Sequence, residues 1–158
     1  MKKTLLFCAC FMLVGFSVLA APSRLEESEV SASNLKSILG ERFGTSIDED
    51  GMIIVKKGEF FRANIIIDRE NKVLLFFHGW TAKPSADKLK CLEKLNRWNF
   101  DRGFNCVVYD QENKVFLWSY NMLYTGGITS INLLDTVELL LGNEEDFVKE
   151  FYEAGLLE

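Results

Sequence analysis

Apolar side chains recur every three or four residues in four stretches of the chain, which is the spacing of a buried helix face. The first stretch ends near Gly44, and the second opens near Pro84 and runs to about Asn99. A third helix is expected from about Ser130, and Gly142 predicts its end and the start of a fourth. The four apolar faces contain Leu35, Ile38, Leu39 and Phe43; Leu89, Leu92, Leu95 and Trp98; Leu133, Leu134, Val137, Leu140 and Leu141; and Phe147, Val148 and Phe151.

Five shorter apolar runs lie between these helices and predict β-strands. They cover residues 52–55, 60–67, 73–77, 104–109 and 115–122. Because the turns within each group of strands are short and polar, neighbouring strands are expected to run antiparallel. The order of elements is α-β-β-β-α-β-β-α-α. It predicts an α+β fold with a five-stranded antiparallel sheet and helices packed on one face.

Two of the predicted turns have nearly the same sequence. Asp68-Arg-Glu-Asn-Lys-Val and Asp110-Gln-Glu-Asn-Lys-Val agree at five of six positions, 42 residues apart. Turn chemistry explains this similarity, because Asp and Asn tolerate the backbone of a turn and Lys protects a strand edge. Duplication of a unit of hairpin and helix is the alternative explanation.

The central strands of the predicted sheet carry apolar side chains on both faces. In the third strand, Val73, Leu75 and Phe77 alternate with residues that are also apolar. Helices on one face leave the other face to be covered by something else. We therefore expect a partner protein or a second copy of the chain to bind an aromatic sheet face. The residues expected at that contact are Phe76, Trp80, Phe116, Trp118 and Tyr120. The C-terminal helices are the alternative contact surface.

The first twenty residues have the three parts of a secretory signal peptide. Lys2 and Lys3 precede an uncharged run, and Val18-Leu19-Ala20 supplies residues that signal peptidase accepts. We expect cleavage near Ala20 and a periplasmic or secreted protein, with an uncleaved membrane anchor as the alternative. The polar, acidic residues 21–32 predict a flexible tether, and residues 33–158 predict a single domain.

The composition of the chain after Ala20 narrows the class of protein. Its 138 residues are about 44% hydrophobic, carry a net charge of −7 and retain 17 of the 20 aromatic side chains. A disordered chain is excluded, and the acidic balance argues against nucleic-acid binding. No second long apolar run follows the signal, so no stable membrane insertion is expected after its cleavage.

Two cysteines remain after Ala20. Cys91 lies in a predicted helix and Cys106 in the strand that follows it. An oxidising compartment would allow a disulfide between them, and two separate buried thiols are the alternative. No CxxC spacing is present, so neither cysteine is predicted to be catalytic.

No set of residues predicts catalysis, a cofactor or a metal site. His78 is the only histidine and ends a hydrophobic strand, which favours a structural role. The loop 46–51 resembles half of a calcium-binding loop, but Lys57 stands where the closing carboxylate belongs. The pair Gly126-Gly127 lacks the spacing of a phosphate-binding loop. Glu144, with the two acidic residues after it, is predicted to lie at a helix N-terminus.

Two short motifs resemble the YbjN family. Leu95-Asn96-Arg97-Trp98-Asn99 ends the second predicted helix, and Gly126-Gly127-Ile128-Thr129 precedes the third. The similarity extends over residues 33–153, and its most specific part is the helix end from Asn96 to Asn99 followed by the glycine pair. Within this motif, Asn99 is expected to cap backbone groups and Trp98 to pack in the core.

The resemblance implies a regulator of bacterial sensory transduction. It also implies a fold similar to type III secretion chaperones, whose antiparallel sheet and flanking helices often dimerise and bind polypeptide. The prediction is therefore an exported, non-enzymatic protein-binding or regulatory module of the bacterial envelope, acting in a chaperone-like way. The alternative is a small envelope enzyme or small-molecule-binding protein with its site near His78 and Trp80.

Overall fold

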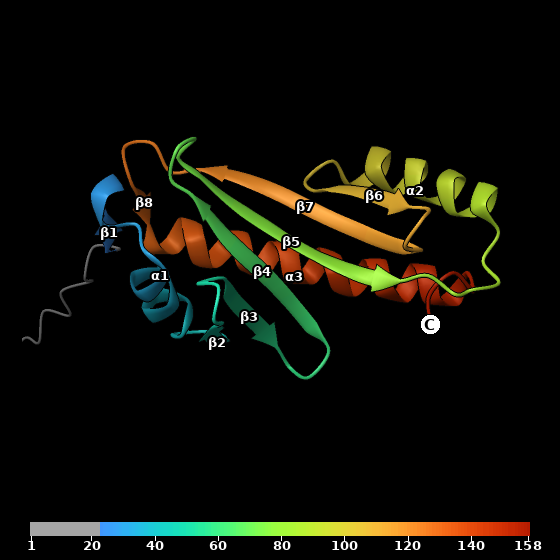
Figure 1. The fold of residues 1–158 in the computed structure, drawn as a ribbon, viewed down its shortest axis with the longest axis horizontal. Helices are drawn as coiled ribbons and strands as arrows, with labels where there is room; N and C mark the ends of the chain where they lie inside the picture. The colour runs from blue at the N-terminus through green and yellow to red at the C-terminus, as the bar shows by residue number, and fades with distance from the viewer. Residues whose placement is uncertain (1–22) are drawn as a thin grey trace, which may run out of the picture.

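The computed structural model describes residues 23–158, so the predicted signal peptide and its cleavage site near Ala20 lie outside the described residues. Figure 1 shows a twisted sheet with one long helix lying across it. The elements in chain order are β1 (Arg24–Leu25), a short 3-10 turn (Glu27–Glu29), α1 (Ala32–Leu39), β2 (Gly44–Ile47), β3 (Ile53–Lys57), β4 (Phe61–Asp68), β5 (Val73–Thr81), α2 (Lys88–Arg102), β6 (Cys106–Asp110), β7 (Val115–Leu123), β8 (Ile128–Thr129) and α3 (Ser130–Glu153).

Six strands form one antiparallel sheet in the order β2-β3-β4-β5-β7-β6. α3 packs on this sheet, and the ring centroids of Phe147 on α3 and Phe116 on β7 are 5.7 Å apart. α2 joins the same layer, since Trp98 lies 5.4 Å from Phe147, and α1 also contacts α3. The α+β class and the antiparallel sheet are therefore confirmed.

The strand count and the helix order differ from the prediction. The sheet has six strands rather than five, because β2 pairs with β3 along its whole length. Gly44–Ile47 reads Gly-Thr-Ser-Ile, and a single apolar residue cannot show the alternation that marks a strand. α3 is one helix of 24 residues rather than two. Buried residues on both sides of Gly142 hold it against the sheet, and this packing outweighs the low helix propensity of one glycine.

Replacing Gly142 by Ala is expected to raise the free energy of unfolding by about 0.5–1 kcal/mol, because Ala loses less backbone entropy in a helix. An added Cβ at Gly142 meets no atom within 4 Å. Gly127→Ala is the contrast and is expected to destabilise, since Gly127 has a φ of +99°. Urea unfolding followed by circular dichroism measures both changes. A destabilising Gly142→Ala would contradict an uninterrupted α3.

The segment expected to form a tether packs on the domain over its described part. Arg24–Leu25 pair with Ile128–Thr129 as a two-stranded sheet. The backbone N–H of Gly126 donates to the Glu27 carboxylate at 3.2 Å, and this hydrogen bond lowers the pKa of Glu27. A Cβ at Gly127 would collide with the backbone of this segment. The absence of a side chain at Gly127 and the hydrogen bond from Gly126 therefore allow the N-terminal segment to pack beside the start of α3.

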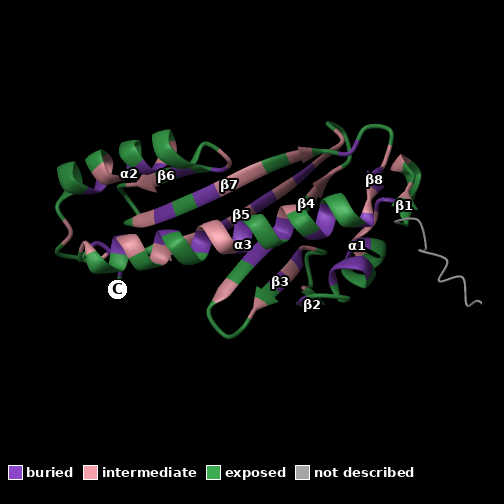
Figure 2. Cartoon of the chain, turned by 180° about the vertical axis from the view of Figure 1, so that it is seen from behind, coloured by how far each residue is buried: buried purple, intermediate pink, exposed green. Residues whose placement is uncertain are grey.

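The aromatic side chains expected on an open sheet face lie in the core instead. The strand register places Phe76 opposite Tyr120 and Trp80 opposite Phe116, with Trp118 on the same face between them. α3 crosses that face, as Figure 2 shows from the helix side. Phe76, Phe116 and Trp118 are at most 1% exposed, while Trp80 and Tyr120 are half-buried against the core. The partner surface predicted from these five residues is therefore wrong.

The two turns of similar sequence have the same hydrogen bonds. In one, the Asn71 side-chain amide donates to the Asp68 carboxylate at 2.8 Å, and in the other Asn113 donates to Asp110 at 2.7 Å. These bonds lower the pKa of both aspartates. The lysine that ends each turn has a positive φ, 57° and 52°. Both segments thus have the hydrogen bonds and backbone expected from turn chemistry.

Candidate functional site

The face of the sheet opposite the helices carries both apolar and polar side chains, and no other element of the described chain covers it. We call it the open sheet face. Its polar residues are Lys56, Arg62, Asn64, Asp68, Thr81, Asp110, Ser119 and Asn121. The register places Leu75 opposite Ile66, and Val108 opposite Leu117, on this face. Leu123 is 70% exposed and Val108 50% exposed. The apolar side chains of the open sheet face are Ile54, Ile66, Val73, Leu75, Phe77, Val108, Val115, Leu117 and Leu123. Figure 1 shows the sheet from this side.

A buried carboxylate lies beneath the sheet, on its helix-covered side. Glu144 on α3 is 1% exposed. Its Oε1 atom accepts hydrogen bonds from the His78 ring, from Trp80 Nε1 at 2.8 Å and from Trp118 Nε1 at 3.2 Å. Its Oε2 atom accepts one from the backbone N–H of Arg62 at 3.2 Å. Four donors therefore satisfy a charge that would otherwise be costly to bury.

His78 connects this carboxylate to the guanidinium group of Arg62. Arg62 Nε donates to His78 Nε2 at 2.8 Å. Because a guanidinium N–H can only donate, Nε2 acts as the acceptor and the ring proton is assigned to Nδ1, which faces Glu144. Both ring nitrogens are thus engaged. The result is a continuous chain of hydrogen bonds from the exposed guanidinium group through the imidazole ring to the buried carboxyl group.

The carboxylate lies where the pairing of β4 with β5 stops. The ladder ends at Asn64 opposite Phe77, so its continuation would pair Ala63 with His78 and then Arg62 with Gly79. The Arg62 N–H donates to Glu144 instead. β5 nevertheless stays paired with β7 as far as Thr81. Figure 1 shows β4 and β5 diverging at this point with α3 behind them.

A cavity of about 270 Å³ occupies the space between the two strands. We call it the strand-split cavity. Its lining includes Lys56, Phe61, Arg62, His78, Gly79 and Trp80. The sequence predicted, as an alternative, a small-molecule site near His78 and Trp80, and this region does contain a small cavity.

Sequence reasoning missed Glu144 because it placed this residue at the start of a separate helix. Once α3 is continuous, Glu144 follows Val137, Leu140 and Leu141 at the spacing of the buried face. An acidic residue in phase with an apolar stripe was the available signal. A buried carboxylate requires donors, and His78 with the tryptophans supplies them.

Asn99 protects the free edge of the sheet. Its side-chain amide donates to the Val107 carbonyl at 2.7 Å and accepts from the Val107 N–H at 2.9 Å. β6 is an edge strand, so these backbone groups would otherwise be open to pairing with another chain. Trp98 is buried in the core, whereas Asn96 is exposed.

Asn99→Ala is expected to lower the free energy of unfolding by about 1–2 kcal/mol, because two hydrogen bonds to Val107 are lost. The variant should also aggregate faster on mild heating, since the edge of β6 is uncovered. Asn96→Ala on the exposed side of α2 is the matched control. Urea unfolding and light scattering test both effects, and equal behaviour of the two variants would contradict the edge-capping role.

The two described cysteines are free thiols in the structure. Cys91 is buried in α2, and burial raises the pKa of its thiol. Cys106 is exposed at the start of β6. The disulfide between them, left open by the sequence, is not formed here.

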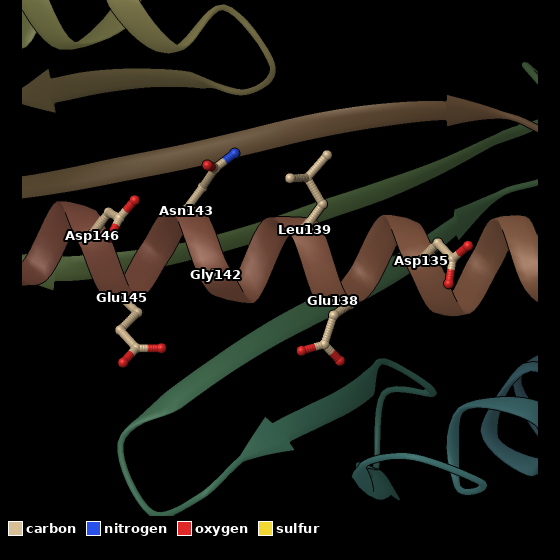
Figure 3. Close-up of a pocket in the computed structure, with 7 residues that line it drawn as sticks. All are labelled: Asp135, Glu138, Leu139, Gly142, Asn143, Glu145 and Asp146. Carbon is tan, nitrogen blue, oxygen red and sulfur yellow. The ribbon is translucent and has the colours of Figure 1, made fainter.

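The exposed surface of α3 carries a shallow groove of about 700 Å³ at Gly142, shown in Figure 3. Four of its seven lining residues are acidic. Asp135 pairs with Arg42 at 3.0 Å, Glu138 with Lys57 at 3.0 Å and Asp146 with Arg102 at 2.9 Å. Only Glu145 has no ion-pair partner among the described residues. The groove therefore offers little free charge to a ligand.

Metal and membrane sites are not found in residues 23–158. No cluster of three or more His, Cys, Asp or Glu side chains that could hold a metal ion occurs in this range. Among the helices that the structure describes, none has the length and apolarity needed to cross a bilayer.

The antiparallel sheet with helices on one face is a fold similar to that of secretion chaperones. The family is more specific than this fold. The family profile described as "Putative bacterial sensory transduction regulator" matches residues 31–153, and the chain therefore belongs to the YbjN family. A search of curated proteins by sequence found no match.

Three solved structures share the fold. YbjN from E. coli, titled a "putative transcription regulator", aligns with a TM-score of 0.67 at 18% identity, covering 82% of this chain and 96% of that one. A chain of the ExsC-ExsE complex aligns with a TM-score of 0.55 at 18% identity, covering 79% and 96%. A chain of the HopA1-SchA chaperone-effector complex aligns with a TM-score of 0.51 at 14% identity, covering 78% and 98%. At these identities the likeness concerns the fold alone.

Proposed function

We propose that this protein is an exported, non-enzymatic regulatory module that binds a polypeptide through its open sheet face. The carrying observation is that nine apolar side chains from five strands share one face that no described element covers. Exposed apolar surfaces of this kind commonly mark interaction sites. Export to the envelope is proposed from the N-terminal signal pattern, with cleavage near Ala20.

The structural neighbours support a protein ligand. Two of them come from structures titled as complexes, one of them a chaperone-effector complex. A chain of the same fold binding a polypeptide on its sheet is consistent with those titles. Self-association through the same face is the second form of this proposal, because an apolar face accepts a copy of itself as readily as a partner.

Photo-crosslinking in the native envelope tests which surface is bound. A benzophenone amino acid at Leu123 or Leu117 places the probe on the open sheet face, and one at Lys149 places it on the exposed side of α3. We expect crosslinks from the two sheet positions and not from Lys149. Sedimentation over a range of concentrations then separates a copy of the chain from another protein. Crosslinks from Lys149 alone would contradict the proposal.

Catalysis by His78 has no support in the geometry. Nδ1 carries the ring proton toward Glu144, and the lone pair of Nε2 accepts from Arg62, so the ring has no free lone pair to remove a proton. The binding alternative near His78 and Trp80 is favoured by one observation, the strand-split cavity.

A further inference from the structure

We propose that the strand-split cavity binds a carboxylate attached to an apolar group. The cavity borders the open sheet face at Lys56 and Arg62, but the inference does not rest on polypeptide binding there. It follows from three features of the cavity: an anchored guanidinium group, a second cation opposite it, and an aromatic wall.

The guanidinium group of Arg62 is held in place from below. Its Nε atom is committed to His78, which is fixed in turn by Glu144. Its two Nη atoms form no hydrogen bond or ion pair with any of the described residues. An arginine fork with a fixed Nε presents these two donors with little further loss of side-chain entropy. This geometry suits the two oxygens of a carboxylate.

A second cation lies directly across the strand pair. Lys56 on β3 is the register partner of Arg62 on β4, and both line the cavity. Lys56 forms no ion pair with the described part of the chain. Two neighbouring cations that are not ion-paired repel one another, and a bound anion relieves that repulsion.

The backbone of β5 supplies a further polar group. The Ala82 N–H donates to the Lys114 carbonyl, and the Tyr124 N–H donates to the Lys72 carbonyl. Even-numbered residues of β5 therefore direct their backbone groups toward β7, and odd-numbered residues toward β4. Gly79 is odd-numbered and lies just past the end of the β4 ladder. Its N–H and C=O consequently face the cavity without a strand partner.

Aromatic side chains form the apolar wall. The ring centroids of Phe61 and Trp80 are 6.3 Å apart, and both residues line the cavity. Phe60 also lines it and is 74% exposed. The ligand that fits is accordingly an amphiphilic acid, either a small aromatic acid or the C-terminal carboxylate of a chain that ends in an apolar residue.

Two acidic residues limit the charge that the cavity accepts. Glu59 lines it and opposes an anion directly. Glu144 is separated from Arg62 by the His78 ring and is satisfied by four donors. The cavity is therefore expected to bind one carboxylate group. Glu59→Gln removes the opposing charge and should bind an amphiphilic acid more tightly than the unchanged protein.

The test compares 3-phenylpropionate with 3-phenylpropanamide, which has the same shape without the charge. NMR titration should show the acid binding at least about tenfold more tightly than the amide, the effect of one charge-assisted hydrogen bond. Arg62→Gln should bring the acid to the level of the amide. Arg97→Gln on α2, where the side chain is 83% exposed, is the matched control and should change nothing.

Lys56→Gln tests the cavity without disturbing the fold, because Lys56 takes no part in the hydrogen bonds that join Arg62, His78 and Glu144. It should weaken acid binding while leaving thermal unfolding unchanged.

A peptide ending in Phe, with a free or an amidated C-terminus, distinguishes the source of the carboxylate. Tighter binding of the free-acid peptide than of phenylpropionate assigns a polypeptide end, and the reverse order assigns a small acid. Equal binding of acid and amide, no binding of either, or an unaffected Arg62→Gln overturns the proposal.

Discussion

Glu144→Ala is expected to lower the free energy of unfolding by about 3–5 kcal/mol, the usual loss when one partner of a buried charged network is removed. The substitution leaves the ring N–H of His78 and the indole N–H groups of Trp80 and Trp118 without an acceptor. The backbone N–H of Arg62 loses its acceptor as well. Urea unfolding followed by tryptophan fluorescence measures the change and also reports on two of the indoles involved.

Glu145→Ala is the matched control, because the neighbouring carboxylate is exposed on the same helix. It should change the stability by no more than about 0.5 kcal/mol. The loss in free energy of unfolding for Glu144→Gln should lie between those of the two alanine variants. Its amide oxygen can still accept a hydrogen bond, but its NH₂ group faces another donor. A loss below about 1 kcal/mol for Glu144→Ala would show that water or another group replaces the carboxylate.

Trp118→Glu is expected to prevent folding, whereas Leu117→Glu should be tolerated. Trp118 is 1% exposed and lies under α3, so the substitution buries a charge and opens a large cavity. Leu117 is the next residue but lies on the opposite face, where it is 38% exposed. Even the milder change Trp118→Ala should lower the free energy of unfolding by about 3–5 kcal/mol.

Circular dichroism and thermal unfolding of the two glutamate variants decide this prediction. Adjacent residues with opposite outcomes are the expected signature of a sheet that has one packed and one open face. A folded Trp118→Glu together with an unfolded Leu117→Glu would mean that the faces are assigned the wrong way round. Leu117→Glu should also reduce crosslinking from Leu123, because the charge lies within the open sheet face.

The pattern of apolar residues predicted much of this fold. Helical spacing located the faces that contain Leu35, Leu95 and Leu133, all of them buried. The polar turns at Asp68 and Asp110 correctly indicated antiparallel hairpins. These signals are local, because periodicity and turn chemistry depend only on neighbours along the chain.

The candidate sites were less accessible to sequence reasoning. Alternation showed that the strands have two apolar faces but could not say which one the helices cover. Phe76 and Phe77 are equally apolar, and only the position of α3 makes the first fully buried and leaves the second half-buried on the opposite face. Gly142 predicts a helix end that α3 does not have, and a helix starting after it would not place Glu144 on a buried face.

The amino-acid sequence by itself determined the fold class, most of the helices and strands, and the resemblance to the YbjN family, because these are written in local periodicity and short motifs. The tertiary structure decided which sheet face is open, where the N-terminal segment packs and how Glu144, His78 and Arg62 meet. Those three residues lie 16 and 66 positions from one another along the chain. The interruption of the ladder between β4 and β5 brings them together, and no spacing in a single sequence records a contact between such distant segments.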